Sequence, residues 1–470
     1  NDDFQNQSSF LSFGYSRGQR RQFNVHFFGD ASNAGNPGPY GSDPDHLFPG
    51  IDTVSRQKRN DFGYQANYTE QFTGRFRQVT TVSASTDRFS FLSAFGDSFS
   101  RNSRIVANTR SEIAIAPKDF LVAGFEYDRE QFTNTFVAGA NNLPFPVPRN
   151  NHAFFAENRW NPGSRWFLNA GIRVDHIRTG NLPPDAFGSR PSIPSSSVTQ
   201  VDPRISVAYL ARESGGSRFG ITRIHSSFGT GIRPPDGFEL GFTDNPQLKP
   251  ERSISVDAGV EQRLAGERAV VDATYFYNRY KDQIVTLGGS FQNLSTFSSA
   301  NLSNSRAYGL ETSLRLRPFR SLEVTGSYTW LNTAILALDG TTQTQFPFQV
   351  GQPLIRRPHN SAGYSITWTR GRLMLNAYGV VRGAVLDLEP NLGNFACTLG
   401  MQCLFRNKGY VLANGGFSYA LPRGIEIYGR LNNFLNQKYE ESFGFPALRL
   451  NFMSGVKFSL PARRAASLNP

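Results

Sequence analysis

Residues 151–177 read NHAFFAENRWNPGSRWFLNAGIRVDHI, and their pattern decides the fold class. From position 166 onward, apolar residues occupy every second position, with polar or small residues between them. Successive side chains of a β-strand point to opposite faces, so this alternation predicts a strand with one apolar and one polar face. The Pro- and Gly-containing segment NPGS (161–164) separates it from an aromatic-rich segment. The stretch therefore predicts an antiparallel hairpin with strands at 151–160 and 165–178.

The same period-two alternation continues along nearly the whole chain, and helical periodicity is almost absent. It predicts about 19 strands. They lie at 8–16, 19–28, 59–71, 76–93, 102–115, 120–137, 151–160, 165–178, 202–210, 218–228, 252–264, 268–287, 304–316, 321–336, 355–368, 373–383, 409–420, 425–434 and 448–460.

The connections between these strands alternate between short and long. The short ones are 16–19, 72–75, 116–119, 161–164, 211–217, 265–267, 317–320, 369–372 and 421–424. The long ones are 29–58, 139–150, 179–201, 229–251, 288–303, 337–354, 384–408 and 435–447. Outer-membrane barrels have tight turns on one rim and long loops on the other, whereas a Greek-key sandwich has no reason to alternate in this way. The predicted fold is all-β: a transmembrane, antiparallel, up-and-down β-barrel.

Bacterial barrels of one chain have an even number of strands and both termini on the short-turn side. Here the first predicted strand ends in a short turn, so residues 1–7 are expected to end a long loop whose other strand is missing. We therefore expect an N-terminally incomplete barrel over residues 1–460, followed by a C-terminal tail at 461–470.

The composition excludes some classes of protein. No window holds 18 consecutive apolar residues, which excludes a transmembrane helix. The net charge is +12, but the 49 Lys and Arg residues are interleaved with acidic residues and form no basic run. We therefore expect no nucleic-acid partner; anionic lipid or an acidic small ligand explains the charge at least as well.

No motif indicates an enzyme, a resident metal or a cofactor. GYSRG (14–18) matches a nucleophile-elbow pattern, but a strand follows it where that motif requires a helix. The six histidines are isolated, and Glu440 and Glu441 point to opposite sides of an extended chain. Cys397 and Cys403 are too few for a zinc site, which leaves a small loop-closing disulfide or two unpaired thiols.

The polar faces of the strands predict the lining of a lumen. Charged side chains facing lipid are costly, whereas a water-filled or plug-filled lumen accommodates them. We expect these residues to face the lumen, either against a plug domain or along an open channel: Arg173, Asp175, Asp257, Glu261, Arg263, Asp272, Glu311, Arg315, Glu426 and Arg430.

Aromatic residues divide into two groups. Those at strand ends, Trp160, Trp166, Trp330 and Trp368, fit the aromatic girdles at the membrane interfaces. Those in long loops either contact a ligand or pack the loops together: Phe238, Phe242, Phe297, Phe443 and Phe445. In the loop at 229–251, Arg233 is a candidate for ligand contact, but neighbouring acidic residues also let it tie the loop down.

Several stretches resemble one family. SSFGTGIRPPDGFEL (226–240) and DNPQLKPERSISVDAGVEQRL (244–264) resemble the mid-barrel motif of TonB-dependent outer-membrane receptors. GRLNNFLNQKYEESFGFPALRLNFMSGVKFSL (429–460) is similar to the C-terminal hairpin of that family. The resemblance covers most of 150–460, and its texture is nearest to vitamin B12 and catecholate-siderophore receptors.

The resemblance implies a 22-stranded barrel filled by an N-terminal plug, in the outer membrane of a Gram-negative bacterium. Such a receptor, here expected to be a monomer in lipid and lipopolysaccharide, imports a ferric siderophore or cobalamin-like ligand using the TonB complex. The sequence contains neither the plug nor the N-terminal segment that contacts TonB, and it continues beyond the closing strand. A passive porin and a soluble β-rich binding or hydrolytic protein are the alternatives.

Overall fold

The computed structural model describes residues 3–18, 20–42, 50–94, 96–134, 145–184, 192–213, 218–241, 245, 247–291, 294–338, 348–388 and 404–459. In this part of the chain, 19 strands form one sheet and β17 and β18 form a second. The strands of the large sheet are β1 (Phe4–Arg17), β2 (Arg21–Gly35), β3 (Arg56–Thr73), β4 (Phe76–Ser93), β5 (Gly96–Ala116), β6 (Asp119–Asn134), β7 (Phe145–Trp160), β8 (Trp166–Thr179), β9 (Ser196–Arg212), β10 (Phe219–Arg233), β11 (Glu251–Leu264), β12 (Ala269–Phe291), β13 (Leu294–Phe319), β14 (Leu322–Ala337), β15 (Asn360–Arg370), β16 (Leu373–Arg382), β19 (Tyr410–Leu421), β20 (Ile425–Asn432) and β21 (Asn451–Phe458). The remaining elements are the strands β17 (Val385–Leu388) and β18 (Leu404–Asn407), the short helix α1 (Gly237–Gly241) and the 3₁₀ turn η1 (Pro422–Gly424).

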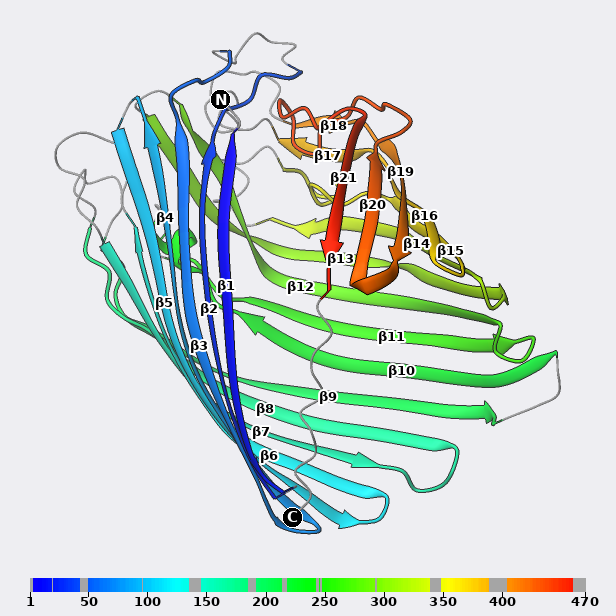
Figure 1. Ribbon diagram of the computed structural model, residues 1–470. Coiled ribbons are helices and arrows are strands. Elements are labelled where there is room, and N and C mark those ends of the chain that lie inside the picture. The colour runs from blue at the N-terminus through cyan, green and yellow to red at the C-terminus, as the bar shows by residue number, and fades with distance from the viewer. Residues whose placement is uncertain are drawn as a thin grey trace.

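Each strand of the large sheet pairs antiparallel with the next strand of that sheet along the chain. β16 pairs with β19, because the intervening β17 and β18 form the separate small sheet. Figure 1 shows that this meander curls round, so that its first and last strands, β1 and β21, stand on the two sides of a gap. Among the described residues, no ladder joins β1 to β21. The predicted all-β, antiparallel, up-and-down architecture is therefore confirmed for the sheet.

The short connections lie together on one rim, as the alternation of loop lengths predicts. Glycines in the left-handed region close several of these turns, including Gly18 (φ 60°) and Gly371 (φ 60°). A side chain would strain the backbone there, whereas glycine adopts this conformation readily. Figure 1 shows these hairpin ends along the lower and right-hand edges of the sheet.

Two predicted long loops are wrong. The segment 288–303 belongs to β12 and β13, which pair as far as Phe291 and Leu294. Its Ser- and Asn-rich sequence is typical of a loop, but hydroxyls such as those of Thr286 and Ser299 bond across the strands at 2.8 Å. Within 384–408, β17 pairs with β18.

The long connections have small apolar cores of their own. One cluster joins Leu302 and Ile335 of the sheet to Phe348 and Leu354 of the following loop. A second packs Leu240 of α1 against Val147 near the start of β7 and against Leu182 and Ile193 of the connection between β8 and β9. Burial of apolar surface between loops therefore holds them over this end of the sheet.

Candidate functional site

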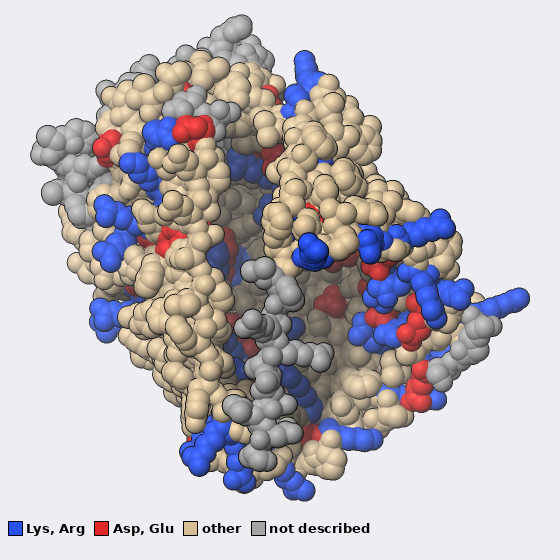
Figure 2. All heavy atoms as spheres, in the orientation of Figure 1, with Lys and Arg blue, Asp and Glu red and all other residues tan. Residues whose placement is uncertain are grey.

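One face of the curved sheet carries most of its charged side chains. Cross-strand partners share a face, so the strand registers determine which residues lie together. These registers place on one face all the charged residues predicted for the lumen: Arg173, Asp175, Asp257, Glu261, Arg263, Asp272, Glu311, Arg315, Glu426 and Arg430. We call it the inner face, because Figure 2 shows acidic and basic side chains inside the hollow. The outer face carries exposed apolar side chains such as Ile172 and Val256.

On the strands from β6 to β12, several of the inner-face charges are paired with one another. Arg173 donates to Glu126 at 2.7 Å and to Asp175 at 2.8 Å, and Asp175 is buried. Further ion pairs are Arg223–Glu261 and Arg263–Glu261. The Ser227 hydroxyl donates to Asp257, and the His225 ring lies 3.1 Å from Asp272. Hydrogen bonds of this kind satisfy charges that the curvature of the sheet shields from solvent.

Toward the C-terminal end of the sheet, several inner-face charges lack such ion-pair partners among the described residues. Glu311, Arg315, Glu426 and Arg430 make no ion pair with any described residue. Arg430 instead lies 5.9 Å from the ring centroid of Tyr428. These charges border the hollow and are available to another partner.

A pocket of about 360 Å³ opens where the inner face meets the long connections. Phe132 of β6 and Phe238 of α1 supply aromatic surface, and Arg59 and Glu130 supply charges of opposite sign. Its other lining residues are Asp87, Phe89, Ser100, Asn102, Asp236 and Gly237. Convergent aromatic and polar groups in a concave site are typical of small-ligand binding. Of the predicted ligand residues, Phe238 is the one that lines this pocket.

The local sequence explains why α1 lies there. The Asp236 carboxylate accepts from the Glu239 backbone N–H at 2.7 Å, and Glu239 accepts from the Asp236 N–H at 2.7 Å. This reciprocal capping box begins the helix. A Cβ on Gly237 would lie 2.3 Å from the Phe132 ring, so glycine lets α1 approach β6 closely.

Arg233 contacts carboxylates on both sides of this loop. Its guanidinium donates to Glu251 at 2.6 Å, and to the two carboxylate oxygens of Glu239 at 3.0 and 2.9 Å. These contacts join the end of β10, α1 and the start of β11. They occupy the donors that a ligand would use, so the geometry favours tying down the loop over ligand contact.

The other predicted loop aromatics have different surroundings. Phe443 is buried, with its ring 4.4 Å from that of Phe405, so it packs loops together. Phe445 is partly exposed. The prediction of Phe297 in a loop is wrong, because its backbone pairs with Gly288 in the extended β12–β13 hairpin. Phe242, Cys397, Cys403 and the 461–470 tail lie outside the described residues.

The long loops also join segments that are far apart in sequence. Glu440 accepts from the Ser42 backbone N–H at 2.8 Å and from the Gly444 N–H at 2.9 Å. Beside it, burial and then the Glu441 carboxylate raise the pKa of the Tyr439 phenol. The two glutamates thus hold loops together.

The described residues show no arrangement typical of an enzyme. Ser16 lies in the tight hairpin between β1 and β2, paired with Gln22. In the part of the chain that the structure describes, no group of three His, Cys, Asp or Glu residues could hold a metal ion. Nor is any helix there long and apolar enough to cross a membrane.

The sequence analysis missed the residues that accompany Phe238 in its pocket. Glu130 and Phe132 continue the inner-face parity of Glu126 along β6, so alternation extended to the strand end was the available signal. The approach of α1 to Glu130 and Phe132 depends on how the loops pack, which the alternation of apolar and polar residues cannot predict.

Comparison with known proteins identifies the family. The family model described as TonB dependent receptor-like, beta-barrel matches residues 1–434. An iron-regulated outer membrane virulence protein of Vibrio cholerae serotype O1 is 24% identical over 307 residues, which are 61% of this chain. The chain spans 41% of the length of that relative.

Solved structures show the same fold. The siderophore receptor PiuA from Acinetobacter baumannii matches with a TM-score of 0.77 and 12% identity, over 97% of this chain and 74% of the other. The closed form of the ferric-catecholate import receptor Fiu from Escherichia coli K12 matches with a TM-score of 0.75 and 13% identity, over 96% and 74%. The chain therefore belongs to the family of TonB-dependent receptor-like β-barrels.

Proposed function

We propose that this chain forms the wall and outer loops of an outer-membrane receptor that actively imports a ferric siderophore. The pocket around Phe238 carries the proposal, because it lies at the long-loop end of a charge-lined inner face. The names of the relatives support iron as the cargo, since they include an iron-regulated outer membrane protein and siderophore receptors. The family is one of transport receptors, which supports a transporter rather than an enzyme.

The inner-face charges suggest how transport is controlled. Glu311, Arg315, Glu426 and Arg430 make no ion pair with described residues, so they are suited to hydrogen bonds with a plug domain in the whole protein. The TonB complex is the proposed partner that drives transport. The outer face contacts lipid and lipopolysaccharide, and the receptor works as a monomer.

The proposed ligand contacts are the aromatic faces of Phe132 and Phe238, with Arg59 at the edge of the pocket. Aromatic side chains bury a large area, and a guanidinium recognises anionic oxygens of a chelate. Arg233 and Phe443 shape the surrounding loops instead.

Uptake by cells tests this function. A strain lacking the chromosomal gene, complemented with the whole gene, is given radiolabelled iron bound to a catecholate siderophore, or labelled cyanocobalamin. We expect saturable iron uptake that disappears when TonB is deleted, and at least a tenfold weaker affinity in Phe238→Ala. The matched control Phe13→Ala changes an exposed aromatic on the outer face of β1, toward the short turn after Arg17, and keeps wild-type affinity.

Each contrary outcome has a clear reading. Uptake that is linear in concentration and independent of TonB identifies a passive channel. TonB-dependent uptake of cyanocobalamin alone would support a TonB-dependent receptor whose cargo is a cobalamin and not a ferric siderophore.

A further inference from the structure

Basic side chains gather on the short-turn rim, which we define as the turns that follow β1, β3, β5, β7, β9, β11, β13, β15 and β19. Every one of these turns contains an arginine or a lysine, from Arg20 after β1 to Arg423 after β19. Figure 2 shows basic side chains along the lower and right-hand edges, where Figure 1 shows the hairpin ends. The rim is therefore a positively charged edge of the molecule.

Most of the cations on the short-turn rim have no acidic partner. Five that lie within the turns themselves are exposed and form no ion pair with any described residue: Arg75, Lys118, Arg268, Arg320 and Arg372. Several acidic residues beside the turns already contact arginines, in the pairs Arg165–Glu213, Arg263–Glu267 and Arg317–Glu323. Grouped cations that lack acidic partners attract an anion from outside the chain.

The opposite end of the strands has the opposite charge balance. In the segments between strands, the short turns hold an excess of basic residues, whereas the long connections hold an excess of acidic residues. Acidic side chains such as Asp52, Asp236 and Glu440 lie in the long connections. The positive net charge of the chain is thus directed toward the side of the short turns, which indicates an anionic partner on that side.

The spacing of the cations indicates an extended partner. Neighbouring strands lie about 4.8 Å apart, so successive hairpin turns of the sheet are spaced by roughly 10 Å. Cations on successive turns therefore form an open arc that follows the whole rim. A globular protein docks on one part of such an arc, whereas a broad, repetitive polyanion contacts several turns at once. Lipid phosphates lie beside the wall of the sheet, whereas Arg75 and Lys118 lie at its end.

We propose that the short-turn rim binds an extended, carboxylate-rich polymer, the peptidoglycan layer beneath the outer membrane. The inference rests on the proposed function, because that function orients the short turns toward the periplasm. The peptide stems of peptidoglycan present carboxylates at regular intervals, and a guanidinium can donate two parallel hydrogen bonds to a carboxylate. Each exposed contact is weak alone, so binding depends on several turns acting together and weakens as salt is added.

Binding of the purified whole protein to isolated peptidoglycan sacculi tests the proposal. Co-sedimentation gives the apparent Kd, and it is repeated with sacculi whose carboxylates have been converted to amides. Vesicles containing phosphatidylglycerol serve as the lipid comparison. The test variant removes one unpaired cation from each of three separate turns, as Arg75→Gln, Arg268→Gln and Arg372→Gln.

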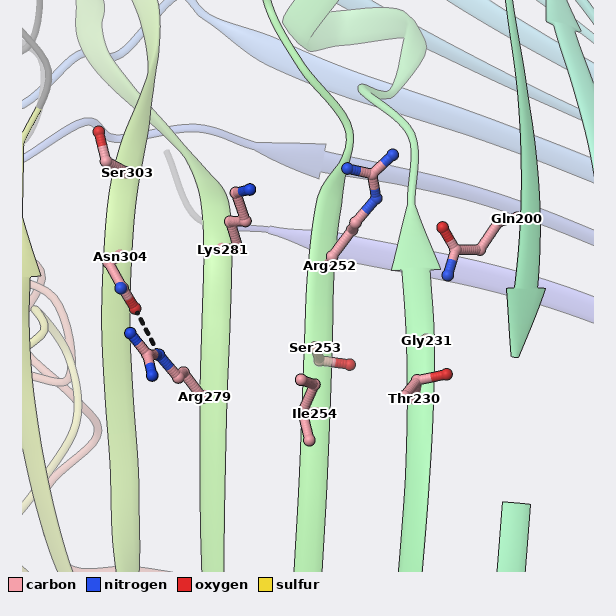
Figure 3. Close-up of a pocket in the computed structure, with 10 residues that line it drawn as sticks. All are labelled: Gln200, Thr230, Gly231, Arg252, Ser253, Ile254, Arg279, Lys281, Ser303 and Asn304. Carbon is pink, nitrogen blue, oxygen red and sulfur yellow. Dashed lines mark hydrogen bonds between the residues drawn. The ribbon is translucent and has the colours of Figure 1, made fainter. Parts of the chain in front are cut away.

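The matched control removes three cations at the long-loop end, as Arg252→Gln, Arg279→Gln and Lys281→Gln. Figure 3 shows these three side chains on two adjacent strands, where they line a pocket. They are also exposed and form no ion pair with any residue that the structure describes. Both variants lose three positive charges, so a general electrostatic effect weakens both equally.

We expect the wild type and the control to bind sacculi with the same affinity, and the test variant to bind at least tenfold more weakly. Binding of the wild type falls as salt is added, and it is lost on the amidated sacculi. The three proteins bind the phosphatidylglycerol vesicles equally. The gel shift between folded and unfolded forms confirms that each variant is folded.

Three results overturn the proposal. They are equal sacculus binding by the test variant and the wild type, unchanged binding to amidated sacculi, and a loss in the test variant that affects the vesicles alone. The last result identifies the rim as a lipid contact. Iron uptake is measured in the same variants. The expected sacculus binding without uptake contradicts the transport function and leaves this inference intact, whereas uptake with equal binding by the test variant does the reverse.

Discussion

At the scale of single residues, Arg233 shows how one side chain shapes the entrance to the hollow. Replacing it, as Arg233→Gln, leaves the buried Glu239 carboxylate without its guanidinium. Losing such a partner costs about 1–3 kcal/mol, and the partial exposure of Arg233 places the effect at the lower end. We expect faster amide hydrogen exchange across residues 234–250, measured by mass spectrometry. Arg233→Lys keeps the positive charge but not the bidentate geometry, so its exchange rate should lie between those of the wild type and Arg233→Gln. Unchanged exchange in Arg233→Gln would refute the clamp.

The sequence allowed the partners of Arg233 to be predicted in kind, because acidic residues flank it on both sides. It did not allow the choice between ligand contact and loop anchoring. That choice depends on Glu239 and Glu251 approaching the same guanidinium, a distance set by the fold of α1. Nor could it reveal the pairing of Glu440 with Ser42, because the two lie 398 positions apart.

At the scale of strands, alternation predicted most of the sheet because its physical cause is local. Each side chain chooses between an apolar and a polar surface, and this choice repeats every two residues. β4, for example, has the predicted bounds of 76–93. The sequence analysis did not predict the extension of β12 and β13, because hydroxyl pairs such as Thr286–Ser299 join the strands there in place of alternating apolar and polar side chains. Where both faces are polar, a period of two carries no signal.

Substitutions on the two faces of β11 test which face points to lipid. Val256 lies on the outer face near the middle of the strand, and Ser255 lies on the inner face. An arginine facing lipid near the midplane costs about 2–4 kcal/mol, whereas one in the hollow meets water and acidic groups. Val256→Arg therefore lowers the yield of folded protein in lipid vesicles, measured by the gel shift between folded and unfolded forms. Ser255→Arg folds at nearly the wild-type yield, and equal yields would reverse the assigned faces.

At the scale of the whole molecule, loops join the two ends of the sheet. β1 and β21 share no ladder among the described residues, yet the loop after β2 contacts the loop before β21. The backbone N–H groups of Tyr40 and Gly41 both donate to the Gly444 carbonyl at 2.8 Å. Because these contacts are so distant in sequence, they restrict the molecule far more than a local turn does.

Glu440 is the side chain on which this junction depends most. It accepts the Ser42 N–H at 2.8 Å, the Ser42 hydroxyl at 3.1 Å and the Gly444 N–H at 2.9 Å. Glu440→Ala leaves these donors without their acceptor, which costs about 1–3 kcal/mol. We expect a lower thermal unfolding midpoint in detergent than for Glu323→Ala, which removes a half-exposed ion pair with Arg317. Gly41→Ala should act like Glu440→Ala, because its Cβ would lie 2.2 Å from the Glu440 carboxylate. If both variants unfold at the midpoint of Glu323→Ala, the junction does not stabilise the sheet.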